Sequence, residues 1–202
     1  QNPALEVILR SWGTLLKIIG LTAAFGGGFN MLFVWWPTYL DKLLTPPIAN
    51  ALTANTIALT CLVGLVLFGG WLCDRLGAKR VVNGSLLVLL VLTYPLFLIA
   101  GQSKFGFALA AQLIFAVAIG GLLGSAPLLM LEQFPPQTRN SGLGLGYSLG
   151  QSLVAGPVPM ISTLLIKITG NLYAPAVYLM GLSLVGLVAV KAMFSIKKQL
   201  LN

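Results

Sequence analysis

The chain alternates long apolar stretches with short polar segments. Six stretches contain no Asp, Glu, Lys or Arg, and each is at least 23 residues long: Ile18 to Leu40, Leu43 to Cys73, Val81 to Ser103, Phe105 to Leu131, Asn140 to Ile166 and Ile168 to Val190. A helix of about 20 apolar residues crosses the hydrocarbon of a bilayer, so each stretch is long enough to span a membrane. A membrane β-barrel would instead show segments of about ten residues with alternating polarity, which these stretches lack. The pattern predicts six transmembrane helices.

The amino-acid composition supports a membrane location and excludes most enzyme classes. Charged residues make up 8% of the 202 residues, hydrophobic residues make up 57%, and the mean hydropathy is +0.94. A typical soluble domain is about 25% charged. The absence of His removes Ser-His-Asp triads, Cys-His pairs and histidine-ligated metals, and the two cysteines, Cys61 and Cys73, cannot build a zinc site. These counts predict an integral membrane protein that is not an enzyme and holds no metal or cofactor.

The basic residues indicate how the helices cross the membrane. They are spread between the apolar runs rather than gathered in a stripe, so the net charge of +8 does not predict nucleic-acid binding. Nine of the twelve Lys and Arg residues fall on the side that carries both termini, and three fall on the other: Lys42, Lys104 and Lys167. Because cytoplasmic loops carry an excess of Lys and Arg, both termini are predicted to be cytoplasmic, in a cell membrane and most simply the inner membrane of a bacterium.

The six spans set the expected domain organisation. Residues 1–17 are predicted to form a cytoplasmic lead-in, residues 18–194 the six-helix bundle, and residues 195–202 a cytoplasmic tail. The chain begins at Gln1 rather than Met and shows no signal peptide, so we expect it to be the middle of a longer protein.

Glycine and polar residues are distributed unevenly among the spans. Gly26, Gly27 and Gly28 lie near the centre of the first span, where they predict either a bending point or close helix packing. The third span is apolar on every side, as in the run from Leu86 to Leu92, and is expected to face lipid, like most of the sixth. The other four spans carry the polar side chains and are expected to face a cavity. This layout is typical of half a transporter.

The second loop carries glycine, acid and base at fixed spacing. It reads Gly-Trp-Leu-Cys-Asp-Arg-Leu-Gly-Ala-Lys-Arg from Gly70 to Arg80. This segment resembles the signature loop of the major facilitator superfamily, G-x-x-x-D-[RK]-x-G-x-[RK]-[RK]. Gly70 would let a neighbouring helix pack close, Gly77 would permit a tight turn, and Asp74 would meet the N-terminal dipole of a helix in the other half. The candidate gating residues of this loop are Gly70, Asp74, Arg75, Gly77, Lys79 and Arg80.

In the superfamily that the second loop resembles, this motif occurs between helices 2 and 3 and, more weakly, between helices 8 and 9. The fourth loop indicates which of the two copies is present. It reads Glu-Gln-Phe-Pro-Pro-Gln-Thr-Arg-Asn-Ser-Gly from Glu132 to Gly142, and Tyr147 follows. It is similar to the E-x-F-P-x-x-x-R-x-x-G-x-x-x-x-Y segment between helices 10 and 11 of the metabolite:proton symporters, which include proline/betaine, α-ketoglutarate, citrate and shikimate carriers. The segment from Trp36 to Leu40 resembles the end of helix 7 there. The resemblance implies an all-α membrane protein whose six transmembrane helices form one half-bundle, helices 7 to 12, of a twelve-helix fold.

The resemblance also implies transport by alternating access, in which two six-helix bundles rock about a site at the middle of the membrane. Asp74, Glu132 and Arg139 would then hold the cytoplasmic gate, with solvated loop charges as the simpler alternative. No Asp or Glu lies deep within a span, so a proton-carrying carboxylate would belong to the N-terminal half.

Hydrogen-bonding and aromatic side chains of the spans are candidates for the substrate cavity. Aromatic faces suit a quaternary ammonium ion, which favours zwitterionic osmolytes such as betaine or proline. The simpler alternatives are an aromatic belt at the membrane interface and hydrogen bonds that join helices. The candidate cavity residues are Asn30, Trp35, Trp36, Tyr39, Gln112, Tyr147 and Gln151.

Together these observations predict a proton symporter of a small polar metabolite, an osmolyte or an organic acid. Its partners would be the substrate, protons, the lipid bilayer and an N-terminal six-helix half. A facilitator or exchanger of the same fold and a self-assembling six-helix protein are the alternatives. Intramembrane proteases are excluded because the spans lack the required His or Asp residues. An aquaporin-like pore is excluded because the single Asn-Pro pair, Asn2-Pro3, precedes the first span.

Overall fold

A computed structural model describes the backbone of residues 11–199 and the side chains of residues 11–194. Every regular element in this range is helical, and six helical spans are long and apolar enough to cross a membrane, which confirms the predicted fold class. π-helical segments (η) interrupt the first and fifth spans. The elements are α2 (Trp12–Phe29), η1 (Asn30–Trp35), α3 (Trp36–Thr38), η2 (Tyr39–Leu43), α4 (Ala51–Leu76), α5 (Ala78–Ala100), α6 (Phe105–Leu131), α7 (Arg139–Gly150), η3 (Gln151–Ala155), α8 (Val158–Thr169) and α9 (Ala174–Gln199).

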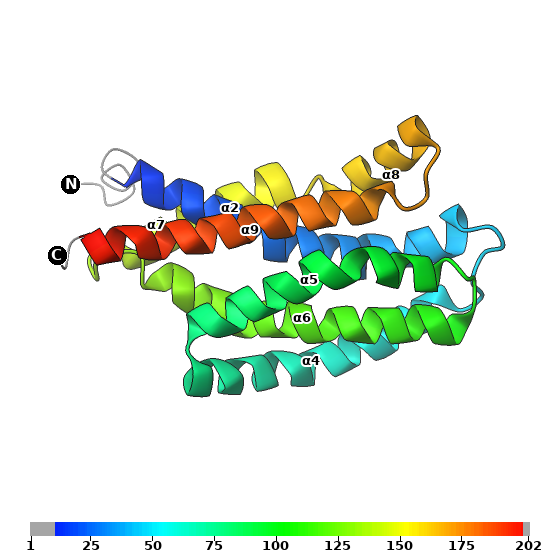
Figure 1. The fold of residues 1–202 in the computed structure, drawn as a ribbon, viewed down its shortest axis with the longest axis horizontal. Helices are drawn as coiled ribbons and strands as arrows, with labels where there is room; N and C mark the ends of the chain where they lie inside the picture. The colour runs from blue at the N-terminus through cyan, green and yellow to red at the C-terminus, as the bar shows by residue number, and fades with distance from the viewer. Residues whose placement is uncertain (1–10, 200–202) are drawn as a thin grey trace.

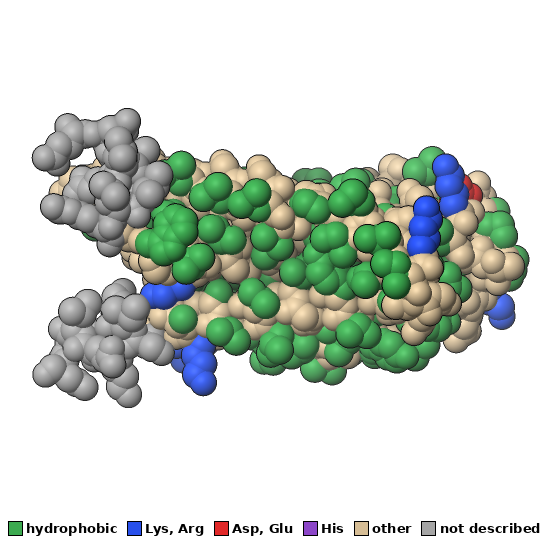
Figure 2. All heavy atoms as spheres, turned by 90° about the horizontal axis from the view of Figure 1, so that it is seen from above, with side chains coloured by type: hydrophobic (Ala, Val, Ile, Leu, Met, Phe, Trp, Pro, Cys, Tyr) green, Lys and Arg blue, Asp and Glu red, His purple; other side chains and the backbone are tan. Residues whose placement is uncertain are grey.

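The helices run side by side, and their connections gather at two ends of the bundle (Figure 1). The start of α2, the end of α9, the turn between α4 and α5, and the loop between α6 and α7 lie at one end, which we call the terminal end. The three other connections lie at the opposite end. Figure 2 shows one face of the surface, where hydrophobic side chains cover the length and charged side chains lie near the two ends. This is the arrangement of helices that cross a bilayer in alternating directions.

Two helices extend beyond the predicted bundle of residues 18–194. α2 begins at Trp12, in the predicted lead-in of residues 1–17, and α9 continues to Gln199, in the predicted tail; the domain bounds themselves stay a prediction. Both helices extend past the apolar stretches because helical hydrogen bonding does not need an apolar surrounding. The rest of the lead-in and tail, residues 1–10 and 200–202, lies outside the described residues, as do the side chains of Lys197 and Lys198.

Glycines bring α4 and α6 into backbone contact. A methyl group added at Gly69 would lie 2.5 Å from the Gly120 carbonyl oxygen, and one added at Gly124 would lie 2.6 Å from the Val66 carbonyl oxygen. Unstrained carbon contacts are about 3.5–4.0 Å long, so larger residues do not fit at this crossing. The Gly70 backbone nitrogen would also lie 2.6 Å from a methyl group at Gly124, whereas a methyl group at Gly70 itself would have its nearest neighbour 3.9 Å away, so the role predicted for Gly70 stays a prediction.

The three glycines of the first span serve packing, and the helix continues through them. α2 is α-helical from Trp12 to Phe29 and contains all three. Methyl groups added at Gly26, Gly27 and Gly28 would lie 2.5–2.9 Å from side chains of η3, α9 and α6, respectively. One turn of α2 is therefore enclosed by three neighbouring helices. Of the two alternatives for these residues, the structure supports close packing.

The third span faces lipid on one side only. α5 buries one face, which includes Val82, Leu86, Leu89 and Phe97, and it packs against α6 and α9. α9 in turn packs along α2 and α5. The two most exposed spans are α4 and the α7–α8 span. Uniform apolar composition could not separate the packed face of α5 from its lipid face, because both are made of the same residue types.

The aromatic residues near the end of the first span are buried inside the bundle. Trp36 and Tyr39 have no exposed surface, and the Trp36 ring centroid lies 4.8 Å from that of Phe97 and 5.6 Å from that of Phe115. Trp35 is 3% exposed. An interfacial belt would place these rings among lipid headgroups. The belt interpretation is therefore wrong for these three residues, because they face neighbouring helices.

Candidate substrate pathway and gate

The first and fifth spans leave α-helical geometry where they contact each other. η1 lies beside α8, and the Asn30 Nδ2 atom donates a 2.8 Å hydrogen bond to the Ala155 carbonyl oxygen at the end of η3. In a continuous α-helix that carbonyl would accept from residue 159, but Pro159 has no N–H. Asn30 therefore replaces the missing backbone donor. Its bond joins two π-helical segments, a type of irregularity that is frequent at functional sites.

Gln112 donates a hydrogen bond to a second backbone carbonyl in an interrupted span. Its Nε2 atom donates to the Leu32 carbonyl oxygen at 3.0 Å and to Asn55 Oδ1 on α4. In a π-helix the Leu32 carbonyl would accept a hydrogen bond from the N–H five residues later. That residue is Pro37, which has no N–H. Gln112 is fully buried. It joins three spans, which is the role of the helix-joining alternative, and its part in a substrate cavity stays a prediction.

The three aromatic candidates also hold helices together. The Trp35 Nε1 atom donates to Thr163 Oγ1 at 2.9 Å, which ties η1 to α8. Trp36 and Tyr39 are fully buried, and neither the Trp36 Nε1 atom nor the Tyr39 hydroxyl has a hydrogen-bond partner among the described residues. Contact of these three rings with a substrate stays a prediction.

A cavity of about 430 Å³ opens between α2, α6 and α7, toward the terminal end. The rings of Phe25 and Tyr147 stack in its wall, with centroids 6.1 Å apart and planes inclined by 29°. Asn140 contributes a polar side chain. Two aromatic rings and an amide in an otherwise apolar wall are typical of pockets for small organic molecules. The remaining wall residues are Leu123, Pro127, Met130, Leu143 and Gly144.

The cavity wall contains one predicted residue, Tyr147, and one that sequence reasoning missed, Phe25. Phe25 lies in an apolar helix directly before Gly26, and the hydrophobic pattern does not separate it from residues that face neighbouring helices. Gln151 follows one turn after Tyr147, and its Oε1 atom is buried beside Gly26 without a hydrogen-bond partner among the described residues. Asn30, Tyr147 and Gln151 are the predicted cavity residues that lie together between the first and fifth spans.

Gly77 forms the turn between α4 and α5. Its φ of +86° lies in the region that favours glycine, which confirms the predicted tight turn. The Arg75 guanidinium carbon lies 4.4 Å from the Trp71 ring centroid, and Lys79 Nζ lies 4.2 Å from the Phe194 ring centroid. These two cations of the loop are therefore held against aromatic faces of the bundle.

Two acids, one in the last turn of α4 and one directly after α6, approach the same buried cysteine. The carboxylates of Asp74 and Glu132 both lie close enough to Cys73 to interact electrostatically with its thiol. The Arg139 Nε atom donates instead to the Phe134 carbonyl oxygen at 3.5 Å. Within the described part of the chain, no ion pair joins Asp74, Glu132 and Arg139. Their gating contacts stay a prediction that involves a second bundle.

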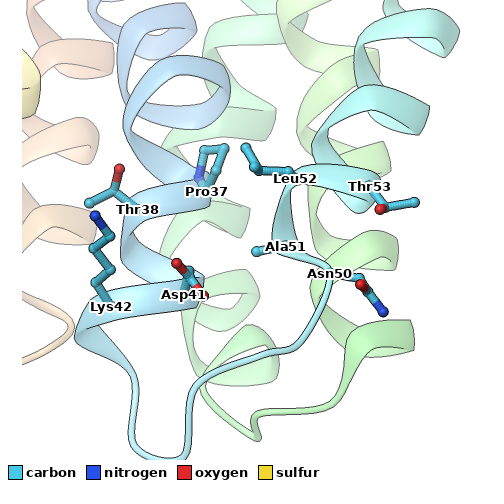
Figure 3. A pocket seen from close by; sticks show the side chains of 8 residues that line it. All are labelled: Pro37, Thr38, Asp41, Lys42, Asn50, Ala51, Leu52 and Thr53. Carbon is cyan, nitrogen blue, oxygen red and sulfur yellow. The ribbon is translucent and has the colours of Figure 1, made fainter.

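A polar pocket of about 600 Å³ lies at the opposite end, between the end of the first span and the start of α4 (Figure 3). Asp41 and Lys42 supply charges of opposite sign, and Thr38, Asn50 and Thr53 supply polar groups. Figure 3 shows the Lys42 side chain directed toward Thr38 rather than toward Asp41. Sequence reasoning assigned no role to these residues, because single charges beside a span are ordinary loop residues.

Similarity to known protein families identifies the family of this chain. The sequence profile of the Major Facilitator Superfamily matches residues 2–159, a range that includes both loop motifs. The chain belongs to the Major Facilitator Superfamily. This membership confirms the predicted twelve-helix family, and the six described spans are the helices of one half-bundle.

Curated relatives of this superfamily member are transporters. The chain is 32% identical to the ectoine/proline transporter ProP of Corynebacterium glutamicum over 184 residues, 29% identical to the proline/betaine transporter of Escherichia coli K12 over 186 residues, and 30% identical to the citrate-proton symporter of Salmonella typhi over 198 residues. The alignments cover 91%, 91% and 93% of the chain, and 36%, 36% and 43% of the relatives. The chain therefore spans less than half the length of these relatives, which are transporters and not enzymes.

Proposed function

We propose that this chain forms one six-helix half of a proton-coupled symporter for a small polar metabolite or osmolyte, with both termini on the cytoplasmic side of a bacterial inner membrane. The observation that carries the proposal is the cavity between α2, α6 and α7. Its stacked rings, Phe25 and Tyr147, lie on the two spans that Asn30 joins at their π-helical segments. The positive-inside pattern of the loops supports the orientation.

The opposite wall of the pathway would come from a second six-helix bundle. α4 and the α7–α8 span are the most exposed spans, and the relatives are more than twice as long as the region aligned with this chain. Tyr147 is 43% exposed, so the cavity wall lies on a surface that a second bundle can cover. Rocking of two such bundles around a shared site gives alternating access.

Proton coupling is supported by the relative named as a citrate-proton symporter. Within residues 11–194 the acidic residues are Asp41, Asp74 and Glu132, all at the ends of the bundle. A proton-carrying carboxylate at the middle of the membrane would therefore come from the second bundle. Asp74 and Glu132, beside Cys73, would meet helix N-termini or cations of that bundle when the cytoplasmic gate closes, and Arg139 would take part in the same contacts.

A zwitterionic osmolyte fits the cavity better than an organic acid. Aromatic faces attract an onium group, and no Lys or Arg lines the cavity to bind a carboxylate. Relatives named for proline, betaine or ectoine support this choice, while the citrate-proton symporter makes an organic acid the second candidate. The carboxylate of a zwitterion would take its hydrogen bonds from Asn140 or from the second bundle.

Substrate protection of a cysteine in the cavity tests the proposal. Gly144 lines the cavity, and a Cβ added there would meet no atom within 4 Å, so Gly144→Cys introduces a thiol without strain. In the full-length protein with all other cysteines replaced by Ser, we expect betaine or proline to slow maleimide labelling of Gly144→Cys, and citrate to have no effect.

Gly181→Cys on α9 is the matched control, because it also points into open space and does not line the cavity. Its labelling rate should be the same with and without solute. Protection by citrate instead would select the organic-acid candidate. Labelling of Gly144→Cys that none of these solutes changes would contradict the assignment of the cavity.

A further inference from the structure

A groove lies between α4 and α5 at the surface of the bundle, and α6 forms its floor. α4 and α5 each pack along α6 but make few contacts with each other, because they diverge after the turn at Gly77. The groove has a volume of about 280 Å³. Its walls are apolar: Leu65, Phe68 and Leu72 come from α4, Val88 from α5 and Val117 from α6.

Two glycines widen the groove. Gly84 on α5 lines it, and a Cβ added there would meet no atom within 4 Å, so the space beside this residue is empty. Gly121 on α6 forms part of the floor, where Ser85 packs directly against its backbone. The groove therefore keeps open space beside α5 that a larger residue at position 84 would occupy.

A single cation, Arg80, lines the groove, at the end of the bundle that carries the Gly77 turn. The other two cations of this loop are held by aromatic rings, Arg75 over Trp71 and Lys79 over Phe194. Arg80 is exposed, and none of the described residues forms an ion pair or ring contact with it. Its charge is thus available to a ligand from outside the bundle.

We propose that this groove binds one acyl chain of an anionic phospholipid whose phosphate pairs with Arg80. The apolar walls match a hydrocarbon chain, and the guanidinium matches phosphate, with which Arg forms two parallel hydrogen bonds. The exposed residues beside the groove on α5, Leu87, Val91 and Leu92, are apolar and continue into a surface suited to lipid. Basic residues at the membrane border attract anionic lipids. This site is separate from the substrate cavity, which lies between α2, α6 and α7.

Lipid retention by the full-length protein tests this site. After delipidation, the protein is mixed with equal amounts of phosphatidylglycerol and phosphatidylcholine with identical acyl chains, and the bound lipids are counted by native mass spectrometry. We expect phosphatidylglycerol to be retained preferentially. Arg80→Gln should lower that preference by about fivefold, the effect of one cation beside an anionic lipid surface. Lys79→Gln, the matched control, should leave the preference unchanged because Phe194 already holds that cation.

A second variant tests the chain-binding part of the groove. Gly84→Phe fills the empty space, and it should lower retention of both lipids; Gly181→Phe on α9 is the control of equal size at an open position outside the groove. If Gly84→Phe does not fold, Val88→Phe narrows the same groove from a position that is 37% exposed. Equal retention of both lipids by the unmodified protein, or unchanged preference in Arg80→Gln, would overturn the proposal. Unchanged retention in the folded groove-filling variant would do the same.

Discussion

Two adjacent glycines at the end of α4 should respond differently to the same substitution. A methyl group at Gly69 would lie 2.5 Å from the Gly120 carbonyl oxygen and 2.9 Å from Gly121 Cα, both of which are backbone atoms of α6. A methyl group at Gly70 would have its nearest neighbour, the Gly124 carbonyl oxygen, 3.9 Å away. Gly69→Ala therefore forces the helices apart, whereas Gly70→Ala adds a methyl group in ordinary contact.

The structure sets the expected size of this difference. Unstrained carbon contacts are about 3.5–4.0 Å long, so Gly69→Ala needs a shift of about 1 Å between two backbones that cannot rotate away. Overpacking of this kind costs about 1–3 kcal/mol, and the better helix propensity of Ala offsets up to about 1 kcal/mol. The free energy of unfolding should fall by about 1–2 kcal/mol for Gly69→Ala. For Gly70→Ala it should stay constant or rise by a few tenths of a kcal/mol.

The assay is the apparent melting temperature of the full-length protein in detergent, measured by size-exclusion chromatography after heating. One kcal/mol shifts the Tm of a domain of 150–250 residues by about 2–4 °C, so Gly69→Ala should melt several degrees below the unmodified protein. Gly70→Ala serves as the matched control and should melt within a degree of it. A Gly69→Ala protein as stable as Gly70→Ala would refute the close α4–α6 contact described here.

Three further substitutions have distinct expected outcomes. Asn30→Ala leaves the Ala155 carbonyl without a donor and should lower the free energy of unfolding by about 1–3 kcal/mol in a melting assay; an unchanged Tm would show that the bond does not stabilise the spans. Gly77→Ala places a side chain at a φ of +86° and should lower the free energy of unfolding by about 1–3 kcal/mol in a denaturant titration; an unchanged free energy would show that the turn does not need this conformation. Tyr147→Ala should weaken betaine protection of Gly144→Cys by about two- to thirtyfold, while Tyr147→Phe should preserve it. Equal effects of the two substitutions would show that the aromatic face of residue 147 does not bind betaine.

The number and type of the spans could be predicted from the sequence because charge-free length alone decides whether a helix can cross a bilayer. The turn at Gly77 could also be predicted, because the resemblance of the second loop to the superfamily signature places a glycine there. The hydrophobic pattern does not give the ends of the helices. α2 begins at Trp12, before the first charge-free stretch, because hydrogen bonding and not hydropathy ends a helix.

The partners of each side chain depend on helix packing, which the hydrophobic pattern does not encode. Trp36 and Tyr39 have the composition and position of an interfacial belt, yet they are buried against α5 and α6. Phe25 is indistinguishable in sequence from its apolar neighbours, and only the approach of α7 makes it part of a cavity wall. Pro159 could have indicated one contact, because a proline leaves the carbonyl four residues before it without a backbone donor, and Asn30 bonds to that carbonyl.

Uphill uptake distinguishes a proton symporter, to which we propose that this bundle belongs, from other transporters of the same fold. The full-length protein is reconstituted in proteoliposomes with an imposed inward proton gradient, and uptake of labelled betaine, proline, citrate and α-ketoglutarate is compared. We expect accumulation of betaine or proline above the external concentration. This accumulation should be lost when an uncoupler removes the gradient and in Asp74→Asn or Arg139→Ala. Uptake that only equalises the two sides, or is independent of the gradient, would contradict proton symport and indicate a facilitator or an exchanger of the same fold.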